Sequence, residues 1–300
     1  MSHGGTRAPA ASLGLLDATM VGVGAMIGAG IFVLTGLAVE TAGPAAVLAF
    51  ALNGGVTTLT ALSYAELASA IPKNGGGYAY VREAFPDSVS FVMGWTRWFT
   101  YVAAGALYAL GFSSNFVEFV HIYWPWLPTG AVFPGGPSYH VVYALAVVVL
   151  FVTLNAVSTE ASGGAETAIT LVKIAILVVF VAFGVFAVRT TEFTPTFPNG
   201  PIALLPAMGL TFIAFQGYDL IATVTEEVEN PRKNIPRAIF ISLAVTVVIY
   251  LLVVSVAIGT LGAEALGASG ETAIADAAEG FMPSFPVIGT GGALIAFGAV

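Results

Sequence analysis

The chain has 300 residues, of which 57% are hydrophobic and only 9% are charged. Soluble proteins carry about 25% charged residues, and a soluble domain of this size could not bury so much apolar surface, so the composition excludes a soluble globular protein. The net charge of −8 is spread over the segments between apolar runs, and the absence of cysteine excludes disulfides, thiol catalysis and Cys-ligated metals.

Eight apolar runs are long enough to cross a bilayer, which takes about 20 residues in a helix. The expected spans are residues 18–39, 42–65, 88–117, 139–158, 167–188, 201–225, 238–262 and 285–300. Because the last run is still apolar at Val300, we interpret the sequence as stopping inside an eighth helix of a longer protein. We expect residues 1–300 to form one all-α polytopic membrane domain.

The positions of lysine and arginine predict the orientation of these spans. If the N-terminus is cytoplasmic, the basic residues of the loops fall mainly on the cytoplasmic side, as the positive-inside rule requires. These residues are Arg7, Lys73, Arg82, Arg232, Lys233 and Arg237, whereas Arg189 alone falls outside. The sequence therefore predicts a multi-pass protein of the cell membrane with a cytoplasmic N-terminus.

The first span contains the glycine-rich stretch "GVGAMIGAGIFVLTG", Gly22–Gly36. Each glycine weakens a helix by about 1 kcal/mol relative to alanine. A dinucleotide-binding turn would need a soluble βαβ unit around it, which the flanks exclude. Close helix packing through Gly24 and Gly28 remains open. The alternative is a helix interrupted near Gly28, whose free main-chain groups bind a solute; an amino acid needs both N–H and C=O ligands.

The segment after the second span, "IPKNGGGYAY", combines a helix-stopping Pro72 with three glycines and the basic Lys73, and Arg82 follows it closely. We interpret it as a cytoplasmic hinge or gate, with a plain connecting loop as the alternative. In the third span, Arg97 lies between Trp95 and Trp98. It is expected mainly to anchor the helix at the inner interface, and the alternative is a partner for an acidic residue.

Lys173 lies within the fifth span, about 10 Å from its cytoplasmic end, which is too deep for its amine to reach the surface fully. A buried lysine near main-chain carbonyls can bind and release a proton as its surroundings change. The alternative is a static amine that holds two helices together. The sixth span is interrupted by Gln216, Gly217 and Asp219, and a buried Asp is usually functional, although here structural pairing is the alternative.

Charged residues follow the sixth span in "EEVENPRKNIPRAI". Glu226 and Glu227 could pair with Arg232 and Arg237 across the inner mouth and latch it. A merely solvated cluster of charges is the alternative. The three histidines are isolated, so no metal site is expected.

Three segments together resemble the amino acid–polyamine–organocation (APC) family of permeases. They are "GAMIGAGIF" (Gly24–Phe32), "SYAELASAIPKNGGGYAYVREAFP" (Ser63–Pro86) and "FIAFQGYDLIATVTEEVENPRKNIPRAI" (Phe212–Ile239). The resemblance implies two inverted repeats of five helices, with helices one and six unwound at mid-membrane around the substrate. It also implies that the second repeat is incomplete in this sequence.

The resemblance implies a set of substrate-binding residues. They are Ile27, Gly28, Ala29 and Gly30 through their main chain, and Phe212, Ile213, Ala214, Phe215 and Gly217 as the facing wall. Either Phe212 or Phe215 would act as an aromatic gate. It further implies that Lys173 replaces a coupling sodium ion, and we take Asp219 as a second coupling candidate. The small Ala214 favours a neutral substrate, whereas Asp219 leaves a cationic one open.

The function expected from these features is proton-coupled secondary transport of amino acids. The alternatives are an exchanger of amino acids or polyamines, a channel, and a sensor that binds solute without moving it. No catalytic motif such as H-E-x-x-H occurs, so an enzyme is not expected. The expected partners are the amino acid and the lipid bilayer, without cofactor, metal or nucleic acid, and the oligomeric state stays open.

Overall fold

The computed structural model describes residues 13–121, 124–133, 135–157, 162–284 and 289–299. These residues form helices and loops, and no β-strand occurs among them. Arg7, the last residue of the expected span 139–158, and residues 285–288 and 300 of the expected span 285–300 lie outside the described part.

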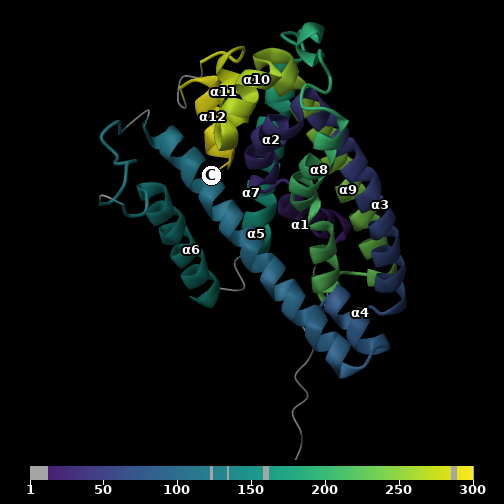
Figure 1. The fold of residues 1–300 in the computed structure, drawn as a ribbon. Coiled ribbons are helices and arrows are strands. Elements are labelled where there is room, and N and C mark those ends of the chain that lie inside the picture. Colours follow the sequence, from purple (N-terminus) through teal and green to yellow (C-terminus); the bar gives the residue numbers. More distant parts are fainter. Residues whose placement is uncertain (1–12, 122–123, 134, 158–161, 285–288, 300) are drawn as a thin grey trace, which may run out of the picture.

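Twelve α-helices of the described residues make up most of the fold (Figure 1). They are α1 (Leu15–Met26), α2 (Ala29–Ala42), α3 (Ala46–Ala70), α4 (Gly77–Ala84), α5 (Asp87–His121), α6 (Tyr139–Val157), α7 (Ser162–Gly184), α8 (Leu204–Phe212), α9 (Pro231–Leu261), α10 (Ala263–Ala268), α11 (Ala273–Glu279) and α12 (Gly291–Ala299). Two 3₁₀ segments, η4 (Ile213–Phe215) and η5 (Tyr218–Glu227), follow α8.

The expected spans correspond to these helices with two differences in form. The first span is divided between α1 and α2, and the sixth between α8, η4 and η5. The loop after the second span contains an extra helix, α4. Helix α5 has 35 residues, which makes it about 52 Å long, whereas the hydrocarbon core is about 30 Å thick. It accordingly runs obliquely across the bundle in Figure 1.

Helices α1 and α2 occupy the centre of the bundle. Figure 1 shows them between α3, α8 and α9 on one side and α5 and α7 on the other, with α10, α11 and α12 at one end. Their side chains form much of the apolar core, since Val23, Met26, Ile31 and Phe32 are at most 1% exposed. The divided first crossing is therefore the most enclosed part of the molecule.

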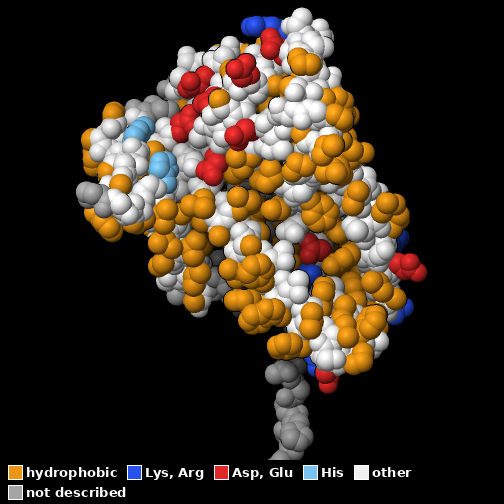
Figure 2. Space-filling model, in the orientation of Figure 1, with side chains coloured by type: hydrophobic (Ala, Val, Ile, Leu, Met, Phe, Trp, Pro, Cys, Tyr) orange, Lys and Arg blue, Asp and Glu red, His pale blue; other side chains and the backbone are white. Residues whose placement is uncertain are grey.

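Large apolar side chains are exposed on the outer helices, as lipid requires. Leu59 of α3, Phe91 of α5, Val149 of α6 and Val178 of α7 are examples. Figure 2 shows hydrophobic side chains over the body of the molecule and acidic side chains gathered at the end near α10 and α11. Among the described residues, four segments are long and apolar enough to cross a membrane: Leu15–Ala70, Thr167–Gly184, Pro201–Glu227 and Pro231–Leu261. The all-helical chain is a multi-pass membrane protein.

Glycine allows α2 to lie directly against the segment before α11. A Cβ on Gly36 would overlap the main-chain oxygen of Gly270 and lie 2.8 Å from the Cβ of Ala273. By contrast, a Cβ on Gly55 of α3 would meet no atom within 4 Å. Packing therefore requires glycine at position 36 but not at position 55.

Replacing these glycines by alanine should have opposite effects on stability. Gly36→Ala forces two main-chain segments apart and should cost about 1–3 kcal/mol. Gly55→Ala should be neutral or stabilise α3 by up to about 1 kcal/mol, because alanine is the better helix former. The apparent melting temperatures of the purified variants in detergent measure the difference. Equal melting temperatures would contradict this account of the packing.

Candidate functional site

The first crossing is interrupted at Ile27 and Gly28. Helix α1 ends at Met26, and the next two residues leave the helical region, with ψ angles of 32° and −148°. Ile27 still donates its N–H to the oxygen of Val23 (2.7 Å) and its side chain is fully buried. Helix α2 then begins at Ala29, so its first N–H groups have no partner within the helix.

The sixth crossing is interrupted next to this point. After the turn of η4, Gln216 is extended and Gly217 has a φ of +137°, a conformation that glycine adopts without strain. A Cβ on Gly217 would lie 2.7 Å from the Cβ of Ala25 and 2.8 Å from the nitrogen of Met26. Both its conformation and its space require glycine, because here the two interrupted crossings touch.

A single hydroxyl group connects the main chains of the two interruptions. Tyr250 of α9 is fully buried, and its hydroxyl is within hydrogen-bonding distance of the carbonyl oxygens of Met26 and Ala214, the latter at 2.9 Å. A phenol has only one proton, so the two carbonyls, which lie where the helices are interrupted, share this single donor. Its ring packs on Phe50 and Phe215, at centroid distances of 5.7 and 5.2 Å. Sequence reasoning missed Tyr250; a lone tyrosine in an apolar span was the available signal.

A cavity of about 220 Å³ lies beside the interruption of the sixth crossing. It is lined by Phe212, Phe215, Gln216, Tyr218 and Asp219, by Thr57 and Tyr64 of α3, and by Met93, Thr96, Arg97, Thr100 and Tyr101 of α5. Thr57 is 1% exposed, and its hydroxyl has no hydrogen-bond partner in the described structure. A buried hydroxyl without a partner costs free energy, so the site offers an unused polar group.

The structure brings together part of the substrate-binding residues expected from the sequence. Phe212 and Phe215 line the cavity, and of the two Phe212 is the more exposed, at 39% against 1%. Gly30 packs on Ala214, with 3.0 Å between its Cβ position and the Cα of Ala214. Of the other expected residues, Ile27, Gly28, Ile213 and Gly217 do not line this cavity, and the side chain of Ala29 lies outside the described part.

Asp219 forms a partly buried ion pair with Arg97 of α5, at 2.9 Å. The hydroxyl of Tyr101 accepts a hydrogen bond from Arg97 and donates one to Asp219 at 3.1 Å. The N–H of Gly217 donates to the other carboxylate oxygen at 3.2 Å. Arg97 is thus the partner of an acidic residue, the second of the two roles considered from the sequence, and Asp219 is structurally paired.

Lys173 lies on α7, which packs against α1 and α9. Thr170 of the same helix packs against Gly24 of α1, where a Cβ would meet the threonine hydroxyl. Lys173 lines a second cavity, of about 380 Å³, with Tyr108 of α5 and Phe151 of α6. No hydrogen bond or ion pair joins its amine to another residue of the described part. The structure therefore leaves this amine unpaired between α5, α6 and α7.

The start of the first crossing and the end of the sixth are connected through main-chain bonds. The N–H of Leu13 donates to the oxygen of Glu227 (3.0 Å), and the N–H of Glu229 donates to the oxygen of Leu13 (2.9 Å). Asn74 of the glycine-rich loop accepts from the N–H of Glu226 (2.8 Å). Sequence reasoning considered the charges of this region and missed Asn74.

The charged gating candidates are not paired with one another in the described residues. Lys73 pairs with Glu83 of α4 at 2.7 Å, and this hydrogen bond lowers the pKa of the exposed Glu83 carboxyl. Arg232 and Arg237 line an open basic hollow at the start of α9. Arg82, Glu226, Glu227, Arg232 and Arg237 form no ion pair among the residues that the structure describes.

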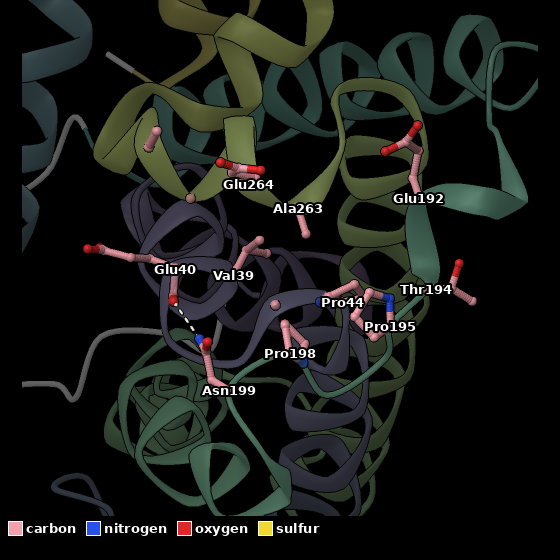
Figure 3. Close-up of a pocket in the computed structure, with 13 residues that line it drawn as sticks. Val39, Glu40, Pro44, Glu192, Thr194, Pro195, Pro198, Asn199, Ala263 and Glu264 are labelled. Atoms are coloured by element: carbon pink, nitrogen blue, oxygen red, sulfur yellow. Dashed lines mark hydrogen bonds between the residues drawn. The ribbon is translucent and has the colours of Figure 1, made fainter.

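A further cavity, of about 490 Å³, opens at the opposite end of the central helices. Figure 3 shows Glu40, Glu192 and Glu264 around it, with Pro44, Pro195 and Pro198 on its floor. The amide of Asn199 donates to the oxygen of Glu40 at 3.3 Å and fastens the loop before α8 to α2 (Figure 3). Within the described residues, no group of three or more His, Cys, Asp or Glu could hold a metal ion.

Comparison with known proteins identifies the family. The family model described as amino acid permease matches residues 13–300. The chain belongs to the amino acid permease family. It is 33% identical over 262 residues to the methylthioribose transporter of Bacillus subtilis, and 30% identical over 256 residues to the branched-chain amino acid permease of the same bacterium. It is also 30% identical over 247 residues to the chloroplastic cationic amino acid transporter 9 of Arabidopsis thaliana.

The matches cover most of this chain and about half of each relative. The match to the methylthioribose transporter covers 85% of this chain and 56% of that protein. The corresponding shares are 83% and 55% for the branched-chain amino acid permease, and 80% and 43% for the cationic amino acid transporter. These relatives are named for three different substrates. The family and these relatives are permeases and transporters, not enzymes, and the solute is left to be argued from the site.

Removing the Tyr250 hydroxyl should damage the site more than an equivalent change at the surface. Tyr250→Phe leaves the buried carbonyls of Met26 and Ala214 without a donor, which should cost about 1–3 kcal/mol of stability. Tyr143→Phe is the matched control, because it also removes a hydroxyl bonded to a main-chain oxygen, that of Pro128 at 2.8 Å, but in an exposed place where water replaces it.

Thermal unfolding in detergent and uptake in proteoliposomes measure both effects. The Tyr250 variant should melt several degrees lower and lose most uptake, and the Tyr143 variant should resemble the wild type. If the two variants behaved alike, the hydroxyl bridge would have no special role.

Proposed function

We propose that the protein is a secondary active transporter that carries neutral amino acids across the cell membrane by proton-coupled alternating access. The observation that supports this most is the contact between two interrupted crossings beside a cavity with an unpartnered hydroxyl. Interrupted helices supply main-chain ligands in a membrane interior, where such groups are tolerated only next to a cavity or a protein partner.

An amino acid suits these ligands because it carries both charges at one carbon. The first N–H groups of α2, from Ala29 onward, favour a carboxylate, since a helix N-terminus carries a partial positive charge. The carbonyl oxygens that end α1 and η4 favour an ammonium group. Binding the substrate requires the two interruptions to separate from their present contact at Gly217, and the cavity next to Phe212 and Thr57 would receive the side chain.

The residues proposed to bind substrate remain those of the two interruptions. They are Ile27, Gly28, Ala29 and Gly30 on one side and Phe212, Ile213, Ala214, Phe215 and Gly217 on the other. Phe212 is the better candidate for a movable aromatic gate, because Phe215 is held between Phe50 and Tyr250. A cavity of about 220 Å³ is smaller than the roughly 300–1,000 Å³ of pockets for drug-sized ligands, in keeping with a small solute.

The cytoplasmic gate is proposed to open where Leu13 and Asn74 now hold the end of η5. Opening would break the bonds to Glu226, Glu227 and Glu229. The basic residues Lys73, Arg82, Arg232 and Arg237 lie on this side in the proposed orientation, with the N-terminus cytoplasmic. Their charges would keep the gate in contact with the inner leaflet.

Lys173 is proposed as the proton-binding group, and Asp219 is the second candidate. The Lys173 amine is desolvated without a counter-ion, so its protonation depends on which side of the membrane it contacts. Asp219 is the weaker candidate because it already forms an ion pair with Arg97, and protonation of its carboxylate would break that pair.

A second candidate substrate follows from the relative at 33% identity, whose name specifies methylthioribose. A sugar derivative carries no zwitterion and would use the hydroxyl and amide groups of Thr57 and Gln216 rather than the helix ends. Flux measurements separate the alternatives. A channel and a non-transporting sensor show no counterflow of labelled substrate, and an obligatory exchanger shows counterflow but no net accumulation driven by a pH gradient.

Uptake by the full-length protein in sodium-free proteoliposomes with an imposed pH gradient tests the coupling. A panel of labelled amino acids, polyamines and methylthioribose should show saturable, gradient-driven accumulation of neutral amino acids. Lys173→Ala should lower this accumulation by about tenfold or more, because it removes the proton-binding amine. Lys233→Ala, which removes an exposed lysine, is the control and should leave it unchanged.

Two results would contradict the proposal. Transport that requires sodium and ignores the pH gradient would exclude proton coupling, as would full activity of Lys173→Ala. Accumulation of methylthioribose without any amino acid would replace the proposed substrate class.

A further inference from the structure

The cavity beside the sixth crossing contains one positive and one negative side chain, and they neutralise each other. Of its twelve lining residues, all of them described, only Arg97 and Asp219 are charged. Their side chains are 15% and 17% exposed, and the nitrogen and oxygen atoms are 2.9 Å apart. The cavity wall thus carries two full charges and no net charge.

The Asp219 carboxylate already accepts three hydrogen bonds within this network. One oxygen accepts from Arg97 and from Tyr101, and the other accepts from the N–H of Gly217. The guanidinium also lies over the ring of Tyr101, 5.1 Å from its centroid. Arg97 is fixed by packing as well as by charge, so it does not leave the carboxylate free for a solute.

We propose that the Arg97–Asp219 pair is the specificity determinant that restricts the substrate to amino acids with uncharged side chains. This inference rests on the proposed function, which places the substrate side chain in this cavity. A cationic side chain would need Asp219 as its counter-ion, but Arg97 holds that position and repels a second cation. An anionic side chain meets the same obstacle from Asp219.

The physical reason for the selectivity is the low dielectric constant of the site. Paired charges are tolerated there, whereas a buried charge without its partner is strongly unfavourable. Removing one member of the pair leaves the other uncompensated, and a solute of opposite charge then restores neutrality. The pair therefore acts by rejecting wrong substrates and not by attracting the right one.

The two single substitutions should consequently change selectivity in opposite directions. Arg97→Met leaves Asp219 unpaired and should admit lysine, which resembles norleucine but ends in an ammonium group. Asp219→Asn leaves Arg97 unpaired and should admit glutamate, which resembles glutamine but carries a carboxylate. Arg97→Lys preserves the pair and should keep the wild-type preference, and the double variant Arg97→Met/Asp219→Asn should again prefer neutral solutes.

Competition against a labelled neutral amino acid, in proteoliposomes containing the full-length protein, measures these preferences. Protection of the detergent-solubilised protein against thermal unfolding by each solute gives a second measure that does not require transport. The ratio of lysine to norleucine affinity should rise by about tenfold or more in Arg97→Met, and the ratio of glutamate to glutamine should rise similarly in Asp219→Asn.

The outcomes separate this inference from the function on which it rests. If the wild type binds neutral amino acids but accepts lysine as readily as norleucine, or if the folded single variants keep the wild-type ratios, the specificity role is wrong and the transport function stands. If one single variant does not fold, the affinity ratio of the other variant tests the specificity role. If neither folds, the ratio of lysine to norleucine affinity in the wild type tests it. A wild type that binds neither norleucine nor glutamine overturns the proposed function together with the inference.

Discussion

The structure depends on how the main-chain groups freed by two broken helices are satisfied inside an apolar bundle. A carbonyl without a partner in such a place costs several kcal/mol, so a broken crossing persists only if something replaces the lost bond. In this chain the replacement is the hydroxyl of Tyr250, which serves both Met26 and Ala214. One side chain on α9 thereby joins the ends of the first and the sixth crossing, and the contact of Gly217 with α1 brings them to van der Waals distance.

Charged side chains inside the bundle also need a partner or access to a cavity, and the two cases differ in which of these they have. Arg97 and Asp219 compensate each other and are further bonded to Tyr101 and Gly217, so this network is static unless a partner is lost. Lys173 has no counter-ion within the described part of the chain, and it borders a cavity instead. The first arrangement suits selectivity, because its charges are already compensated, and the second suits coupling, because an unpaired amine responds to access by water.

The sequence predicted the features that depend on local pattern. Apolar run length predicted helices that the structure contains, and Gly28 and Gly217, which the sequence singled out, lie at the ends of helical segments. The helix α4 within the glycine-rich loop was not expected, because its eight residues carry no apolar run. Which of Phe212 and Phe215 is movable could not be decided from the sequence, because burial against Phe50 is a tertiary property.

Contacts between residues far apart in the chain could not be predicted from the sequence. Arg97 and Asp219 are 122 residues apart, and Tyr250 is 224 residues from Met26, so no local signal connects them. The end of η5 illustrates the same limit. Acidic and basic side chains in one segment suggested a charged latch, whereas Asn74 and the main chain of Leu13 make the bonds there. Composition identifies which groups need a partner, and only the fold determines which partner they find.

The central claim is that main-chain atoms of the two interrupted crossings form the substrate site. An electron cryomicroscopy structure of the full-length protein with a transported amino acid bound tests it most directly. The account predicts density for the α-carboxylate at the N–H groups from Gly28 to Gly30, and density for the α-ammonium at the carbonyls near Met26 and Ala214, with the two interruptions moved apart. Continuous α-helices in both crossings, or a substrate bound away from these atoms, would contradict it.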